Sequence, residues 1–135
     1  MKILLVGASG TISKAVEQAL SRDHTLVRAN HSGGDVQVDL GSPESIQAMF
    51  ATVGPVDAVI SAAGVASVGA FKDLTDADYE LALQNKLMGQ INLTRFGRTS
   101  INEGGSITLT SGVKKRCFAR RPIERTRKIN GNRRN

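Results

Sequence analysis

The chain has 135 residues, of which 18 are Lys or Arg and 12 are Asp or Glu, so its formal net charge is +6. A chain of this length can bury roughly two-thirds of its unfolded surface around one core, which predicts a single domain. No apolar run approaches the roughly 18 residues that a membrane span needs, and the start lacks a signal-peptide cleavage pattern. We therefore expect a cytoplasmic protein without a membrane partner.

The positive charge is confined to the end of the chain. Residues 1–112 contain 8 basic and 11 acidic side chains, a net charge of −3, whereas residues 113–135 contain 10 basic and 1 acidic side chain, a net charge of +9. The second segment has no sustained period of 2 or 3.6 residues and few large apolar side chains. This composition predicts a basic tail that is disordered or aberrantly translated. We do not expect a nucleic-acid partner, and a polyanion-binding arm is the alternative interpretation of the tail.

The chain has few metal-binding side chains. Its single cysteine, Cys117, excludes an intramolecular disulfide and suits a reducing compartment. The two histidines, His24 and His31, have no other ligand type near them at metal spacing. We therefore expect no metal site.

The first 112 residues alternate strand and helix signals. Helices are predicted after the first strand, from the N-cap Ser42 and from the N-cap Thr75, and Gly104-Gly105 predicts a turn. Strands separated by helices imply right-handed crossovers, so we expect an α/β fold with an incomplete Rossmann-type doubly wound parallel sheet of about five strands. The predicted strands are residues 2–6, 25–29, 36–38, 57–61 and 106–110.

The turn after the first strand has the sequence Gly7-Ala8-Ser9-Gly10-Thr11-Ile12-Ser13. Gly7 allows a sharp turn and Gly10 lets the backbone approach a phosphate, while the helix that follows offers free N–H groups and the positive end of its dipole. Ser13 stands where the dinucleotide-binding pattern has its third glycine. The turn predicts a pyrophosphate site, and an ordinary strand-to-helix turn is the alternative.

The end of the second strand bears on the choice of dinucleotide. In such sites an acidic residue about 20 positions past the glycines contacts the ribose 2′-hydroxyl, and a basic residue contacts a 2′-phosphate. The sequence here is Arg28-Ala29-Asn30-His31-Ser32, without a carboxylate. Arg28, His31 and Ser32 favour NADP over NAD, and the alternative is that Arg28 and His31 are solvated loop residues.

Five motifs stand in the order and spacing of the short-chain dehydrogenase/reductase family. They are Gly7–Ser13, Val38-Asp39-Leu40, Ser61-Ala62-Ala63-Gly64, Asn85, and Ile107-Thr108-Leu109-Thr110-Ser111-Gly112. Residues 1–112 therefore resemble that family, and the resemblance implies a partial NAD(P)-binding Rossmann domain. The family reaction is hydride transfer between the nicotinamide and a carbonyl or alcohol.

The resemblance also implies where the cofactor binds. The glycine turn would hold the pyrophosphate, the third strand's end would meet the adenine ring, and the fourth strand's exit would line the adenine–ribose channel. The implied cofactor residues are Gly7, Ser9, Gly10, Thr11, Ile12, Asp39, Leu40, Ala62, Ala63 and Gly64. Each motif alone also has a plain structural interpretation as a strand end or a turn.

The implied catalytic residues are incomplete. Asn85 resembles the helix asparagine that anchors a water in the family's proton relay, and Ser111 resembles its active-site serine. The family's proton donor is a tyrosine about a dozen residues after that serine, followed by a lysine, but the single tyrosine here, Tyr79, precedes Ser111. A missing general acid costs about 10² to 10⁴ in rate. We therefore expect dinucleotide binding without measurable turnover from this truncated chain.

The helix predicted over residues 75–101 has an apolar stripe. By the family resemblance, the face formed by Leu83, Leu87, Met88 and Ile91 could pair with a second copy of the chain, which would give a homo-oligomer, and burial inside the monomer is the alternative. The stripe consists of Tyr79, Leu83, Leu87, Met88, Ile91 and Phe96.

Overall fold

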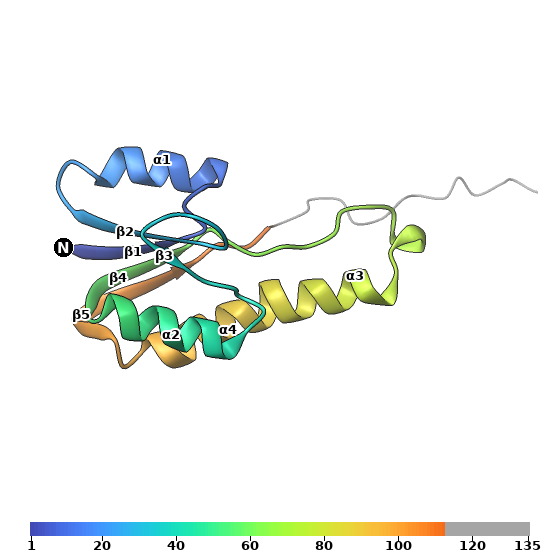
Figure 1. The fold of residues 1–135 in the computed structure, drawn as a ribbon. Coiled ribbons are helices and arrows are strands. Elements are labelled where there is room, and N and C mark those ends of the chain that lie inside the picture. The colour runs from blue at the N-terminus through green and yellow to red at the C-terminus, as the bar shows by residue number, and fades with distance from the viewer. Residues whose placement is uncertain (113–135) are drawn as a thin grey trace, which may run out of the picture.

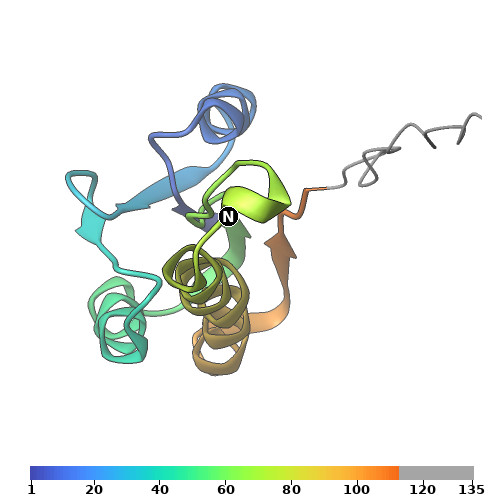
Figure 2. The ribbon, with the colours of Figure 1, turned by 90° about the vertical axis from the view of Figure 1, so that its right-hand side faces the viewer.

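The computed structural model describes residues 1–112; the basic segment 113–135, with its predicted disorder and its polyanion-binding alternative, lies outside the described residues. Five strands form one parallel sheet in the order β3-β2-β1-β4-β5. The strands are β1 (Lys2–Val6), β2 (Thr25–Asn30), β3 (Val36–Gln37), β4 (Val56–Ser61) and β5 (Ile101–Leu109). Helices lie on both faces of the sheet (Figures 1 and 2), which confirms the predicted Rossmann-type α/β fold.

The two faces of the sheet carry different helices. Helix α1 (Thr11–Leu20) covers one face, and α2 (Pro43–Val53) and α4 (Gly89–Gly97) cover the other (Figure 2). Ser42 caps α2 as predicted, because its hydroxyl oxygen accepts a hydrogen bond from the Ser45 N–H at 3.2 Å. None of the helices in residues 1–112 is long and apolar enough to cross a membrane.

The core lies between the sheet and the α2/α4 layer. Strand β1 is buried on both faces, as expected for a central parallel strand. The side chains of this core come from the three central strands, from the segment after β3, and from α2 and α4. They are Leu4, Val6, Ala29, Val38, Leu40, Ile46, Met49, Phe50, Val56, Val59 and Leu93.

The predicted long helix differs from a continuous α-helix. It consists of α3 (Asp76–Leu81), the π-helical segment η2 (Ala82–Met88) and α4. In a π-helix the hydrogen bonds join residues five positions apart, instead of four as in an α-helix, so the π-helical segment changes which side chains face the core. Most of the predicted stripe is exposed in the monomer, namely Tyr79, Leu83, Leu87 and Ile91, whereas Met88 and Phe96 are partly buried and Phe96 packs against the core. The fully buried positions of α4 are Gly89, Asn92, Leu93 and Gly97.

The predicted turn at Gly104-Gly105 is wrong. Strand β5 runs through both glycines, and its pairing with β4 shifts there: Val56 pairs with Ile101, but Ala58 pairs with Ser106. The three extra residues of β5 form a bulge-like irregularity, in which Gly104 has a φ of +78°. Glycines of a bulge and glycines of a turn give the same sequence signal, so the pattern alone did not distinguish them.

Helix α3 begins with a capping box that also holds the loop after β4. The Thr75 hydroxyl oxygen accepts a bond from the Asp78 N–H at 3.3 Å, and the Asp78 carboxylate accepts one from the Thr75 N–H at 2.9 Å. The Ser67 hydroxyl donates to the same carboxylate at 2.6 Å. These hydrogen bonds lower the pKa of Asp78 from 3.8 to about 2, and the bond from Ser67 has the largest effect.

We expect the Asp78 carboxylate to contribute to stability above about pH 4 and to lose that contribution as the pH falls toward about 2. The sign follows because the folded pKa lies below the unfolded one, so acid protonates the unfolded chain first. Asp78→Asn removes the titrating group, so its midpoint of urea unfolding should fall less between pH 5 and pH 3 than that of the wild type. Asp76→Asn, in the same helical turn, is the control and should follow the wild type. An equal fall for Asp78→Asn would contradict the assignment.

Candidate functional site

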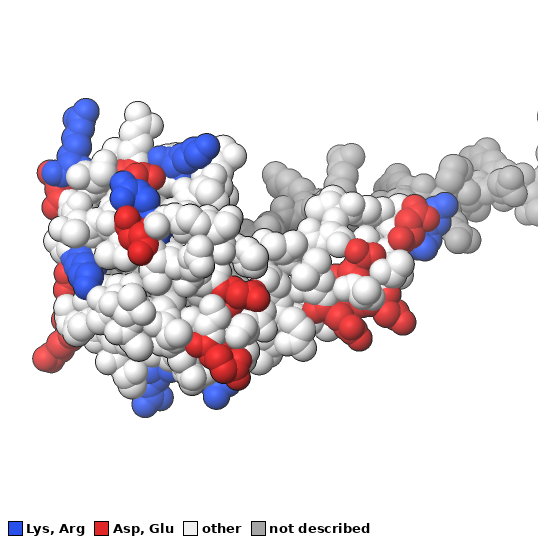
Figure 3. Space-filling view, viewed as in Figure 1, with Lys and Arg blue, Asp and Glu red and all other residues white. Residues whose placement is uncertain are grey.

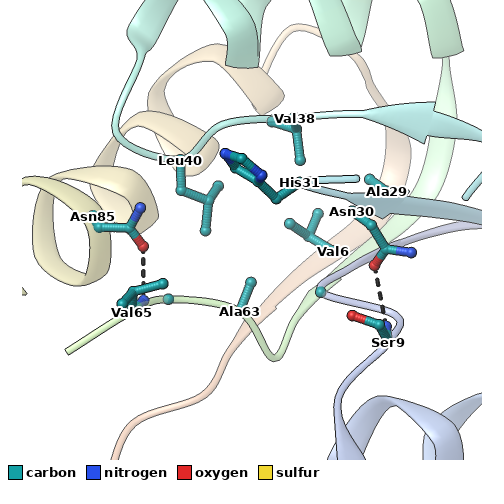
Figure 4. A pocket seen from close by; sticks show the side chains of 12 residues that line it. Val6, Ser9, Ala29, Asn30, His31, Val38, Leu40, Ala63, Val65 and Asn85 are labelled. Carbon is teal, nitrogen blue, oxygen red and sulfur yellow. Dashed lines mark hydrogen bonds between the residues drawn. The ribbon is translucent and has the colours of Figure 1, made fainter. Parts of the chain in front are cut away.

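A pocket of about 170 Å³ opens at the carboxyl ends of the central strands. Strand β1 lies between β2 and β4, so the connections that leave β1 and β4 run to opposite sides of the sheet's centre. Parallel α/β sheets bind ligands outside the strand ends at this switch point. The lining residues are Val6, Gly7, Ser9, Ala29, Asn30, His31, Val38, Leu40, Ala63, Gly64, Val65 and Asn85 (Figure 4).

The turn from β1 into α1 leaves the helix N-terminus open. Gly7 has a φ of +82°, and a Cβ added there would lie 2.7 Å from the Cβ of Ala63, so only glycine fits. Gly10 is the N-cap of α1 and has no side chain to cap the first turn. The first N–H groups of α1 are therefore available to an anion.

A side chain from β2 fixes this turn. The Asn30 side-chain oxygen accepts a hydrogen bond from the Ser9 N–H at 3.1 Å (Figure 4). Sequence reasoning missed Asn30 as a site residue, although its position at the end of β2 was the available signal. It joins the second strand to the glycine turn across 21 residues of sequence.

Ser13, at the third glycine position, is fully buried in the first turns of α1, and its hydroxyl has no hydrogen-bond partner among residues 1–112. The small side chain permits the helix to lie close to the sheet. Thr11 and Ile12, which precede it, are exposed at the same helix end. The residues predicted to surround a pyrophosphate, from Gly7 to Ile12, are therefore together at the N-terminus of α1.

The three residues predicted to contact a 2′-phosphate are not together. His31 lines the pocket (Figure 4), whereas Ser32 is exposed and is not part of its lining. The Arg28 guanidinium is bound to carboxylates: its Nε donates to Glu17 at 2.7 Å, its Nη2 also bonds Glu17, and Asp35 lies 3.5 Å away. The hydrogen bond to Glu17 is the largest of the effects that raise the pKa of Arg28. Arg28 would have to leave these partners to contact a ligand.

Asp39 stabilises the segment that enters α2. Its carboxylate accepts a bond from the Gly41 N–H at 2.8 Å, and its own N–H donates to the Ser45 hydroxyl at 2.9 Å. Leu40 lines the pocket, but Asp39 does not. The structure thus places the predicted adenine-binding residue beside the pocket with its carboxylate engaged in a turn.

The segment after β4 forms the opposite wall. Ala63 and Gly64 line the pocket, whereas Ala62, whose N–H donates to the Val6 carbonyl at 3.0 Å, is not part of its lining. The Asn85 side-chain oxygen accepts a bond from the Val65 N–H at 2.7 Å (Figure 4). Asn85 therefore faces the pocket and holds its wall, a contact that sequence reasoning did not assign to it.

Ser111 follows the end of β5 at the same edge of the sheet. The preceding residue, Thr110, donates its N–H to the Ser61 carbonyl at 3.0 Å and accepts a bond from the Gln90 side chain at 2.8 Å. Ser111 itself is exposed and does not line the pocket. Tyr79 lies on α3, and its hydroxyl donates a hydrogen bond to the Phe71 carbonyl at 3.3 Å. It therefore does not bind Ser111.

Within residues 1–112, no group of three or more His, Cys, Asp or Glu side chains lies close enough to hold a metal ion. The charged side chains on the face shown in Figure 3 are instead spread over the sheet domain, with an acidic group on the projecting α3.

We expect Gly7→Ala to destabilise the protein more than Gly33→Ala. Both glycines have positive φ, +82° and +72°, but a Cβ at Gly33 has no atom within 4 Å whereas one at Gly7 collides with Ala63. Each variant should lose about 1 kcal/mol or more for the backbone conformation, and Gly7→Ala should lose more because β1 and β4 must separate. Urea unfolding measures the difference, and equal losses would contradict the close contact with Ala63.

Residues 5–123 match the family model described as enoyl-(acyl carrier protein) reductase. The protein lin1944 from Listeria innocua is similar in structure, with a TM-score of 0.80 and 44% identity over 83% of this chain and 56% of that chain. A small-chain dehydrogenase in complex with NADPH has a TM-score of 0.73 and 26% identity, over 83% of this chain and 51% of that chain.

Two curated proteins, both reductases by name, are also similar to this chain in sequence. Versicolorin reductase 1 of Aspergillus parasiticus is 34% identical over 80 residues, which are 56% of this chain and 30% of that protein. Versicolorin reductase stcU of Emericella nidulans is 28% identical over 131 residues, 80% of this chain and 50% of that protein. The chain thus spans half or less of the length of these two curated relatives.

Proposed function

Since the chain belongs to the short-chain dehydrogenase/reductase family, we propose that its pocket binds a nicotinamide dinucleotide. The observation that carries the proposal is the open N-terminus of α1 directly beside the pocket. Gly10 leaves the first turn uncapped and Gly7 turns the chain where no Cβ fits. These are the properties that a pyrophosphate site requires.

The residues that line the pocket fit a nicotinamide dinucleotide. Apolar side chains of Val6, Ala29, Val38 and Leu40 line one part of the pocket and suit the flat face of an adenine ring. The backbone from Gly7 to Ile12 would hold the pyrophosphate. Ala63, Gly64 and Val65 would form the wall beside the ribose.

We favour NADP over NAD. The pocket lining contains no carboxylate that would contact a ribose 2′-hydroxyl, and it contains His31 at the end of β2. Ser32 follows in the sequence, and Arg28 would join only on release from Glu17 and Asp35. The small-chain dehydrogenase in complex with NADPH is a structural relative that supports this choice.

The family reaction is hydride transfer between the nicotinamide and a carbonyl or alcohol, and the nicotinamide supplies or accepts the hydride when bound. Ser111 would polarise the substrate oxygen at the end of β5, and Asn85 would support the proton relay. About a dozen residues after Ser111, where the family has its tyrosine, the sequence has Ile123, Glu124 and Arg125, so we propose that this chain binds the dinucleotide without turnover. The cytoplasmic location and the small carbonyl or alcohol substrate stay predictions.

Fluorescence titration with NADPH and with NADH tests the binding proposal. We expect saturable binding with higher affinity for NADPH. Gly10→Val should weaken it about tenfold or more, because a lost charge-assisted hydrogen bond costs about 1.5–3 kcal/mol. Gly10 has a φ of −75°, and a Cβ there lies no closer than 3.4 Å to another atom, so the variant should fold. Because valine is a poorer N-cap residue than glycine, its melting temperature is measured alongside to separate a loss of stability from a loss of affinity.

Wild-type protein that binds neither dinucleotide would contradict the proposal, as would a Gly10→Val variant with unchanged affinity. Turnover is measured in parallel as NADPH consumption with a panel of aldehydes and ketones. We expect none above the background. Consumption that disappears in Ser111→Ala would show that the chain supplies a proton donor which the sequence does not reveal.

We also propose that an exposed apolar row on η2 and α4, formed by Leu83, Leu87 and Ile91, is a homo-oligomer interface. Leu83 is 52% exposed, Leu87 51% and Ile91 40%, and they follow one another along the same helical element. An apolar surface of this kind on a soluble protein marks a contact with another protein surface.

Sedimentation velocity tests the interface. We expect Leu87→Glu to shift the wild-type oligomer to monomer, because a charge would be buried without a partner. Val68→Glu is the matched control: Val68 is 88% exposed in the loop before α3 and its variant should sediment like the wild type. A monomeric wild type, or equal behaviour of both variants, would contradict the proposal.

A further inference from the structure

Lys86 holds the pocket wall from behind. It lies in η2 and is half-buried, and its ammonium donates a hydrogen bond to the Ala63 carbonyl at 2.9 Å. Its stem packs against Gly64 so closely that a Cβ added to this glycine would lie 3.3 Å from the Lys86 Cα and would collide with its Cδ. Gly64 has a φ of +125°, which glycine adopts readily, so a glycine turn and the lysine stem together shape the wall.

The other side of Ala63 touches the glycine turn. A Cβ added at Gly7 would lie 2.7 Å from the Ala63 Cβ, 2.9 Å from its Cα and 3.0 Å from its N. Ala63 is therefore enclosed between the Lys86 ammonium and the Gly7 backbone. Any movement of Ala63 toward or away from η2 changes the space in which Gly7 makes its turn.

The π-helical turn brings two consecutive side chains to the same loop. Asn85 binds the Val65 N–H and Lys86 binds the Ala63 carbonyl, whereas consecutive side chains of an α-helix diverge by about 100°. The wider π-turn reduces this angle. One turn later, Gln90 binds the Thr110 carbonyl, so this part of the helix binds the exits of both β4 and β5.

Fold stability alone explains Lys86 poorly. The side chain is half-buried, and its ammonium has no carboxylate within ion-pair distance in residues 1–112. An apolar side chain of the same length would fill the space over Gly64 equally well. What lysine adds at this position is the hydrogen-bond donor to the Ala63 carbonyl.

We propose that Lys86 is a positioning residue for the dinucleotide site: through the Ala63 carbonyl it sets the distance between the β4 exit loop and the glycine turn. The inference rests on the proposed function for its ligand. It assigns Lys86 to the cofactor site although its side chain does not line the pocket.

The test compares Lys86→Met, which keeps the stem and removes the donor, with Lys86→Arg, which keeps a cationic donor. Lys72→Met is the control, since Lys72 is an exposed lysine whose nearest carboxylate is Asp73 at 3.9 Å. Two quantities are measured on the full chain: the amide chemical shifts of Gly7 and Ser9 without ligand, and the affinity for NADPH. Lys86→Met should shift both amides and weaken NADPH about tenfold; Lys86→Arg should recover most of the affinity, and Lys72→Met should match the wild type.

A folded Lys86→Met variant with wild-type Gly7 and Ser9 shifts and wild-type affinity would overturn the inference. So would a loss of melting temperature with unchanged affinity, because a purely structural lysine behaves in that way. If Lys86→Met does not fold, Lys86→Gln replaces it and the same two readouts decide. If the wild type does not bind NADPH, the proposed function fails, while the ligand-free amide shifts still decide whether Lys86 sets the position of the glycine turn.

Discussion

The close contact between Gly7 and Ala63 is the constraint on which the site depends. Strands β1 and β4 are neighbours in the sheet and end at the same edge, so the two loops that leave them must pass each other there. Gly7 allows this because it has no side chain and adopts a positive φ. One wall of the pocket is therefore the glycine turn, and the other is the segment from Ala63 to Val65.

Hydrogen bonds from side chains to backbone atoms, and not additional apolar packing, fix the loops that line the pocket. Asn30 holds Ser9, Asn85 holds Val65, and Lys86 holds Ala63. The core on the α2/α4 side fixes the strands from which these loops emerge, and the polar contacts then fix the loops. Such an arrangement leaves the N–H groups of α1 free for a ligand while the surrounding backbone is already ordered, which favours binding by a preformed site.

The sequence predicted those features that depend on neighbouring residues. The strand positions, the caps at Ser42 and Thr75, and the glycine turn are all local patterns, and the structure contains them. The π-helical segment was missed because the apolar residues of this stretch are spaced as in an ordinary α-helix. One widened turn changes which of them are buried, and the spacing does not show it. The engagement of Arg28 by Glu17 and the hold of Lys86 on Ala63 were missed because each pairs residues that only the folded chain brings together.

The most direct test of the dinucleotide site is a map of amide chemical shifts across the chain on addition of NADP. We expect the amides of the glycine turn from Gly7 to Ile12, of Asn30 and His31, and of Gly64 and Val65 to shift together and to saturate at one concentration. Amides at Gln47 and Thr99, on the α2 and α4 side of the sheet, should stay in place. Shifts confined to that other side, or no saturable shift at the glycine turn, would contradict the assignment of this pocket as the dinucleotide site.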